Sequence, residues 1–123
     1  MAQQWNRPAL PPPRLTADVY ETAGGEAYVL EIAAPGLTTE EITIEATPDN
    51  VKVATQRQQD EQDNGRQYIH REQPVRPMAR LFEFPTEIDP DNIRATLEHG
   101  ILKVYVPKAA ASRPRVIKVD RAA

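Results

Sequence analysis

The sequence predicts an all-β protein, an immunoglobulin-like antiparallel β-sandwich, on three observations. Short apolar runs alternate with polar residues at a period of two, which is the pattern of a strand with one buried face. Seven of the 12 prolines in the 123-residue chain fall between these runs, so no long helix could pass uninterrupted through it. Turn residues separate seven or eight such runs at close spacing, as in a sandwich.

The first half of the chain predicts four strands in two hairpins. A run that includes Ala17 and Val19 is followed, after Gly24 and Gly25, by the alternating run AYVLEIA. Glycine adopts the positive φ of a tight turn without steric cost. The runs EITIEA and NVKVAT then alternate in the same way, and the turn residues PDN join them.

A polar loop and three further runs complete the predicted sandwich. Residues 56–67 are polar throughout, which indicates a solvated loop, and YIHRE after it can form a short strand before two prolines interrupt the ladder. The run NIRATLEHGILKVYVPK predicts a tight hairpin with His99 and Gly100 at its turn. Between them, MARLFEFP places four side chains in one register: Met78, Arg80, Phe82 and Phe84.

The composition argues against several classes of partner. The net charge is −3 with both signs interspersed, so no strong field attracts nucleic acid or an anionic membrane. The chain has no cysteine, which removes disulfides, thiolate catalysis and cysteine zinc sites, and suits a reducing compartment. The N-terminus lacks the pattern of a secretory signal, and no apolar stretch is long enough to span a membrane. We expect a cytoplasmic protein.

The residues that carry chemistry are sparse, and we expect no catalytic, cofactor-binding or metal site. His70 and His99 are the only histidines, and neither has a companion ligand at metal spacing. Ser112 is the sole serine and lies outside any nucleophile elbow. The sequence has no phosphate loop and no dinucleotide fingerprint, so we expect neither an enzyme nor a nucleotide-driven cycle.

Four motifs occur in an order that is similar to a known family. They are ADVYET followed by AYVLEIAAPGLTTEEITIEA, then MARLFEFP, then ATLEHGILKVYVPK, and finally IKV near the C-terminus. Together they resemble the α-crystallin domain of the small heat-shock proteins and their C-terminal I-x-I/V motif. The resemblance implies an N-terminal arm over residues 1–14, an α-crystallin domain over 15–108 and a C-terminal extension over 109–123.

The resemblance implies a homodimer built by strand exchange. In the bacterial and plant branch of the family, a strand on the long polar loop crosses to the partner subunit and completes its sheet. The matching segment here is Tyr68, Ile69, His70, Arg71 and Glu72. The alternative is an ordinary edge strand in the chain's own sheet.

Arg80 shares a register with apolar residues, so an inward-facing guanidinium would need a carboxylate or carbonyl partner. The resemblance places Arg80 at or near the dimer interface. The alternative is an arginine at the rim with its stem packed and its head in water.

The C-terminal tail predicts a contact between subunits. Ile117 and Val119 are two residues apart, so in an extended chain both side chains project to the same side. Burying both gives roughly 3 to 6 kcal/mol, whereas ordering each tether residue costs about 1 to 2 kcal/mol. The contact is therefore weak and depends on repetition around an assembly. The resemblance implies a receiving groove lined by Ile42, Ile44, Ile93, Ala95 and Leu97.

The N-terminal arm is expected to be short and flexible, with about fourteen residues before the first strand. The family's arm is usually longer and rich in residues that contact clients. Trp5 and Leu10 are the large apolar residues here, and PALPPPR favours polyproline geometry. The arm is either a disordered leader or a client contact through these two residues.

The resemblance implies an ATP-independent holdase that forms homodimers and higher homo-oligomers and binds partly unfolded proteins. It needs no cofactor, nucleotide, nucleic acid or membrane. The alternative is a scaffold of the same fold that serves one assembly, as do CS-domain co-chaperones or gas-vesicle accessory proteins. CS-domain proteins lack the swapped strand and the C-terminal motif, so IKV argues against them.

Overall fold

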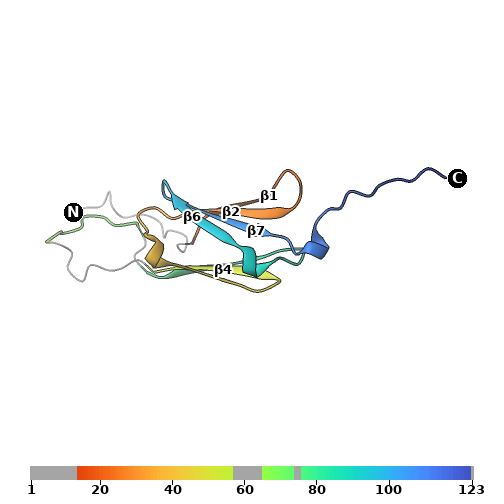
Figure 1. The fold of residues 1–123 in the computed structure, drawn as a ribbon. Coiled ribbons are helices and arrows are strands. Elements are labelled where there is room, and N and C mark those ends of the chain that lie inside the picture. Colours follow the sequence, from red (N-terminus) through yellow and green to blue (C-terminus); the bar gives the residue numbers. More distant parts are fainter. Residues whose placement is uncertain (1–13, 57–64, 74–75, 123) are drawn as a thin grey trace.

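The structure is a computed structural model, and it describes residues 14–56, 65–73 and 76–122. Seven strands form two antiparallel sheets that face each other, one above the other in Figure 1. The described residues contain short 3-10 turns but no α-helix. The predicted all-β class and antiparallel sandwich are thus confirmed.

The two sheets differ in width. The wider has four strands in the order β1-β2-β7-β6, and the narrower has three in the order β3-β4-β5. The wider sheet contains β1 (Ala17–Glu21), β2 (Ala27–Ala33), β7 (Ile101–Pro107) and β6 (Arg94–Glu98). The narrower contains β3 (Ile42–Ala46), β4 (Asn50–Thr55) and β5 (Met78–Glu83). Single turns of 3-10 helix lie at η2 (Thr39–Glu41), η3 (Pro90–Asn92) and η4 (Ala110–Ser112).

The hairpins turn where the sequence predicts. His99 and Gly100 connect β6 to β7 with φ of 54° and 75°, and a two-residue turn with positive φ at both positions matches the twist of the strands. Gly25 has a φ of 70° in the β1–β2 turn, which the Thr22 amide closes by donating to the carbonyl of Ala27 over 2.9 Å.

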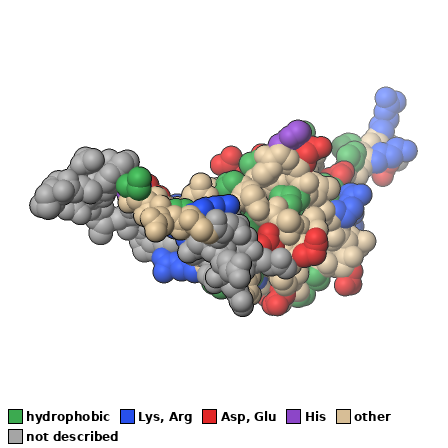
Figure 2. All heavy atoms as spheres, turned by 90° about the vertical axis from the view of Figure 1, so that its left-hand side faces the viewer, with side chains coloured by type: hydrophobic (Ala, Val, Ile, Leu, Met, Phe, Trp, Pro, Cys, Tyr) green, Lys and Arg blue, Asp and Glu red, His purple; other side chains and the backbone are tan. Residues whose placement is uncertain are grey.

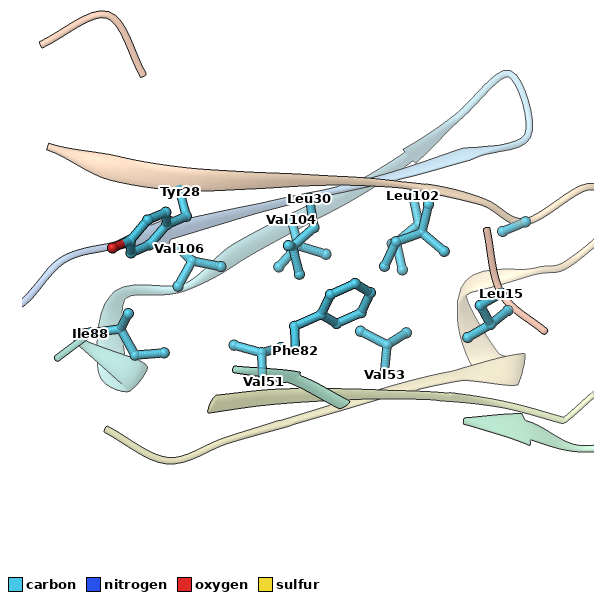
Figure 3. Packing of buried hydrophobic residues seen from close by; sticks show 12 residues of the cluster. Leu15, Tyr28, Leu30, Val51, Val53, Phe82, Ile88, Leu102, Val104 and Val106 are labelled. Atoms are coloured by element: carbon cyan, nitrogen blue, oxygen red, sulfur yellow. The ribbon is translucent and has the colours of Figure 1, made fainter. Parts of the chain in front are cut away.

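The core lies between the sheets and is made by every second residue of the inner strands. Leu30 and Val104 point from the wider sheet toward Val51 and Val53 on the narrower one, with the Phe82 ring between them (Figure 3). Phe82 and Met78 lie opposite Val51 and Thr55 on β4, so the predicted register of β5 is confirmed.

The first prediction concerns this core. Leu30 is fully buried on β2, which pairs with both β1 and β7. We expect Leu30→Ala to lower the free energy of unfolding by about 2 to 5 kcal/mol, because it opens a cavity between the sheets. Urea denaturation followed by circular dichroism, at one protein concentration, measures the loss.

The matched control is Leu81→Ala. Leu81 lies on β5 beside Phe82, but its side chain points to the outer face and is half exposed. We expect a change within about 0.5 kcal/mol. An equal loss in both variants would contradict the assignment of the core.

Candidate assembly site

Four of the five predicted groove residues lie on the inner faces of two edge strands, and the fifth, Ile93, directly precedes one of them. Ile42 and Ile44 on β3 lie opposite Thr55 and Val53 on β4, and both partners are buried. Directly opposed residues of an antiparallel pair point to the same face. Ile42 and Ile44 therefore face the interior, and both are only half buried because β3 ends its sheet.

The predicted groove residues on β6, an edge strand of the wider sheet, also face the interior. Ala95 and Leu97 lie opposite Val104 and Leu102, which point into the core. Ala95 is nevertheless exposed, so the narrower sheet does not cover the inner face of β6. Leu97 is half buried and packs on the core, as does Ile93 just before the strand.

A contact of Arg80 shows which edge strands of the two sheets lie on the same side of the sandwich. Its Nη1 donates to the carbonyl of Leu15, directly before β1, over 2.8 Å. The edge strands β5 and β1 therefore share one side of the sandwich, and β3 and β6 share the other. The structure thus brings all five predicted groove residues to one side, between the two sheet edges.

Arg80 has the carbonyl partner that its inward register requires. The guanidinium carbon lies 5.0 Å from the centre of the Phe82 ring, and the side chain is half buried. Such a position combines a charge-assisted hydrogen bond with packing on an aromatic ring. Its place at a dimer interface stays a prediction.

The second open side of the sandwich is the β1 edge. Val19 lies opposite Leu30 and so points inward, yet it is 50% exposed. Among the described strands only β2 pairs with β1, so the outer side of β1 presents its backbone N–H and C=O groups for pairing.

The segment from Tyr68 to Glu72 is not a strand in this chain, and Ile69 is 78% exposed. The interpretation of this segment as an edge strand in the chain's own sheet is therefore wrong. Two contacts lie within the segment: the Arg71 guanidinium is 4.2 Å from the Tyr68 ring centre, and His70 Nε2 is 2.5 Å from a carboxylate oxygen of Glu72. Its role at a dimer interface stays a prediction.

The tail leaves the sandwich and extends away from it (Figure 1). Ile117 is 82% exposed and Val119 is 89% exposed, so neither touches the groove of its own chain. Residues 109–115, which join the domain to this motif, contain the 3-10 turn η4. Trp5 and Leu10, the proposed client contacts, lie outside the described residues.

The described residues offer little to a catalytic mechanism. They contain no group of three or more His, Asp and Glu side chains that could hold a metal ion. The Tyr20 hydroxyl donates to Glu31 over 2.7 Å, and this hydrogen bond raises the pKa of Tyr20, which makes it a poorer base at neutral pH. Acidic and basic side chains are interspersed over the described part of the face in Figure 2.

Sequence reasoning missed one residue beside this site. Lys108 follows the last strand and is buried, although lysine is almost never fully buried unless it is paired. Its only signal in the sequence is its position, directly after an alternating apolar run and before the polar tail.

Within the described ranges, no helix is long and apolar enough to cross a membrane. The sequence model described as "Hsp20/alpha crystallin family" matches residues 20–120.

Two curated proteins are similar over most of the chain. Spore protein SP21 of Stigmatella aurantiaca (strain DW4/3-1) is 31% identical over 76% of this chain and 56% of its own length. The 18.1 kDa class I heat shock protein of Arabidopsis thaliana is 30% identical over 77% of this chain and 60% of its own length. The chain therefore spans less than two thirds of either relative.

Two solved structures share the fold. A small heat-shock protein from Xylella fastidiosa has a TM-score of 0.66 and 25% identity, covering 87% of this chain and 96% of that one. Heat shock protein 16.0 from Schizosaccharomyces pombe has a TM-score of 0.70 and 19% identity, covering 89% and 99%. Because the Schizosaccharomyces pombe protein is only 19% identical to this chain, its similarity shows a shared fold and nothing further.

The second prediction tests the Arg80 contact. We expect Arg80→Met to lower the free energy of unfolding by about 1 to 3 kcal/mol, because the carbonyl of buried Leu15 loses its donor. Denaturant unfolding measures the loss. Arg94→Met is the matched control, since the Arg94 guanidinium also lies 5.0 Å from a ring, that of Tyr105, but on the outer face. Equal losses would show that ring contact, and not the carbonyl, carries the effect.

Proposed function

The chain belongs to the Hsp20/alpha crystallin family, and we propose that it is an ATP-independent holdase that binds partly unfolded proteins and prevents their aggregation. Family membership also means that the chain is not an enzyme. One observation carries the proposal: apolar side chains on the inner faces of β3 and β6 stay partly exposed at the edge of the sandwich.

Unfolding proteins expose strand edges and apolar segments, which are the features that cause aggregation. An edge with half-buried Ile42, Ile44 and Leu97 offers such segments both a backbone ladder and an apolar seam. The sequence has no phosphate loop that would couple this binding to nucleotide hydrolysis.

The holdase is proposed to be a dimer that exchanges the segment from Tyr68 to Glu72. The segment forms no strand with its own sheets and carries the exposed Ile69. The β1 edge of a partner offers unpaired backbone groups and the half-exposed, inward-facing Val19. Arg80 lies on this side, through its contact with Leu15, which supports its place near the interface.

Dimers are proposed to assemble further when Ile117 and Val119 enter the β3–β6 groove of another subunit. Both side chains are exposed, and the tail extends away from its own groove. The solved relative from Xylella fastidiosa is described as having a distinct high order structure, which is consistent with assembly of this fold.

The proposed location is the cytoplasm, supported by the absence of cysteine. A scaffold dedicated to one assembly is the second candidate function. It would hold one partner through the same edges and would not bind unrelated unfolding proteins.

The third prediction tests the holdase. Without nucleotide, the purified protein is expected to reduce heat-induced light scattering of two unrelated labile clients at near-stoichiometric amounts, because it covers their exposed apolar segments. An equal amount of an unrelated stable protein is the control. No reduction for either client would refute the holdase, and protection of one client alone would favour the scaffold.

The fourth prediction tests the tail contact. The double variant Ile117→Ala and Val119→Ala is expected to reduce the assembly toward dimers in size-exclusion chromatography with light scattering, because both apolar groups lose their burial. Val116→Ala is the matched control, since Val116 is equally exposed and adjacent in the chain but projects to the other side. An unchanged mass in the double variant would reject tail docking.

A further inference from the structure

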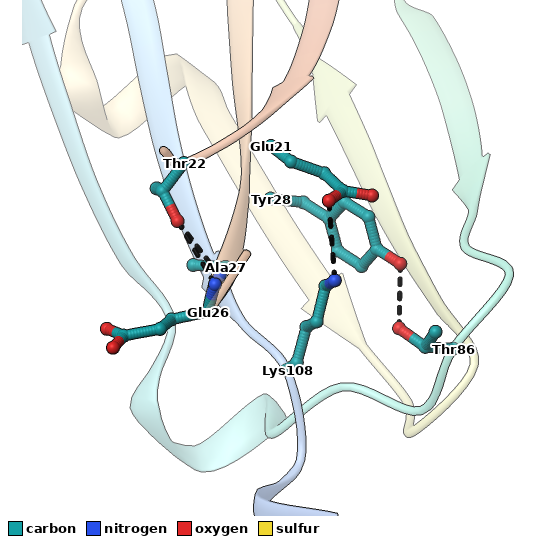
Figure 4. A network of polar contacts seen from close by, with 7 residues as sticks. All are labelled: Glu21, Thr22, Glu26, Ala27, Tyr28, Thr86 and Lys108. Atoms are coloured by element: carbon teal, nitrogen blue, oxygen red, sulfur yellow. Dashed lines mark hydrogen bonds and ion pairs between the residues drawn. The ribbon is translucent and has the colours of Figure 1, made fainter. Parts of the chain in front are cut away.

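The buried Lys108 lies where the tail begins. It follows β7 directly, and only 6% of its surface is exposed. Its Nζ lies 3.5 Å from a carboxylate oxygen of Glu21 and 5.0 Å from the centre of the Tyr28 ring (Figure 4). The ammonium group is therefore held between the end of β1 and the start of β2.

Tyr28 is itself fixed, so the surface under Lys108 is rigid. The Tyr28 hydroxyl shares a 2.7 Å hydrogen bond with the hydroxyl of Thr86 (Figure 4). Its ring stacks on Phe84 with the centroids 4.6 Å apart. A cation placed on such a ring is stabilised by the ring's negative face, and more strongly where water is excluded.

The backbone of Lys108 is tied on both sides. Its N–H donates to the carbonyl of Glu26 over 3.0 Å. Its carbonyl accepts from Arg113 Nε over 2.8 Å, and Lys108 also forms an isolated bridge with Ile88. The next residue, Ala109, donates its N–H to Glu87 over 2.9 Å. The chain is thus held at the last point before the tail.

The contacts continue as far as Pro114. The turn η4 closes when the Ser112 amide donates to the carbonyl of Ala109 over 2.8 Å. Pro114 then packs against Gly25, where an added Cβ would lie 3.1 Å from Pro114 Cγ. Beyond this point Val116 is fully exposed. We call residues 108–114 the tail base.

We propose that Lys108 is a positioning residue that fixes the direction in which the tail leaves the sandwich, and so the angle at which one subunit offers its motif to another. The proposal rests on the tail docking described under the proposed function. A closed assembly forms only if each contact repeats at a consistent rotation. A tail that leaves in many directions can still dock, but it then connects subunits into assemblies of many sizes.

Lys108 also ties the tail base to the dimer edge. Glu21 is the last residue of β1, the strand proposed to receive the partner's exchanged segment. One ion pair therefore joins the tail base to the end of the strand at the proposed dimer edge.

The first test is Lys108→Met, which keeps an unbranched apolar stem and removes the ammonium group. Native mass spectrometry is expected to show an assembly still larger than dimers but with a mass distribution roughly twice as wide, since the tail base loses its side-chain contacts with Glu21 and Tyr28. An unchanged distribution would overturn the proposal.

Two controls separate positioning from stability. Leu30→Ala lowers stability at the centre of the core and changes none of the residues that contact Lys108 or the tail base. It is expected to lower the unfolding temperature and leave the mass distribution unchanged. Lys103→Met removes an exposed positive charge from the same strand, β7, and is expected to change neither. If the mass distribution of every variant broadens in proportion to its loss of stability, Lys108 only stabilises the fold, and the positioning role is wrong.

The second test measures the tail direction itself. The chain has no cysteine, so Thr96→Cys on β6 and Asp120→Cys on the tail give two nitroxide labels for pulsed EPR. The labelled protein carries Ile117→Ala and Val119→Ala to prevent docking and is mixed with excess unlabelled chain. Lys108→Met is expected to broaden the distance distribution roughly twofold, and an identical distribution would overturn the proposal.

The experiments distinguish a failure of tail docking from a failure of the positioning role of Lys108. The double variant Ile117→Ala and Val119→Ala can reduce the assembly to dimers while Lys108→Met changes neither the mass distribution nor the EPR distance distribution. In that case tail docking is supported and the positioning role is wrong. If the double variant leaves the mass unchanged, tail docking is wrong, and the EPR distances still report whether Lys108 orients the tail.

Discussion

The packing of a four-stranded sheet on a three-stranded one is the constraint on which the other features depend. Three strands cannot cover the inner face of four, so both edges of the wider sheet retain inward-facing side chains that the described part of the chain leaves partly exposed. Val19 on β1 and Ala95 on β6 are the evidence, because each is registered with buried core residues yet is exposed. The core is therefore covered at its centre but partly open along the β1 edge and the β6 edge of the wider sheet, which we call the two seams.

The two seams explain why the proposed contacts lie where they do. An edge strand with apolar inner residues is an aggregation hazard unless something covers it. The cover that we propose is an exchanged strand on one side and the tail motif on the other, each supplied by another copy of the same chain. Arg80 and Lys108 hold the elements beside these seams, one by a carbonyl before β1 and the other at the root of the tail.

The alternation of apolar and polar residues was enough to predict the strands, the β5 register and the turn at His99 and Gly100, since these depend on neighbours in the sequence. The alternation could not predict the exposure of Ala95, which only the family resemblance implied, because this exposure depends on how far the opposite sheet extends. The burial of Lys108 was hidden for a similar reason: a lysine after a strand is normally solvated, and only the tertiary placement of Glu21 and Tyr28 changes that. Long-range packing, not local pattern, decides both.

The tail contact that we propose for this seam is expected to be weak. The free energy gained by burying two side chains is similar in size to the entropy lost when the tail residues around them become ordered. A motif with higher affinity would exclude other segments from the β3–β6 groove. A motif with lower affinity would leave the edge strands free to pair with other chains. A contact of intermediate strength, repeated around an assembly, protects the seam most of the time and still yields it to a client segment that brings more apolar surface. In this view, the exchange of tail for client is set by the same mismatch in sheet width that leaves the groove open.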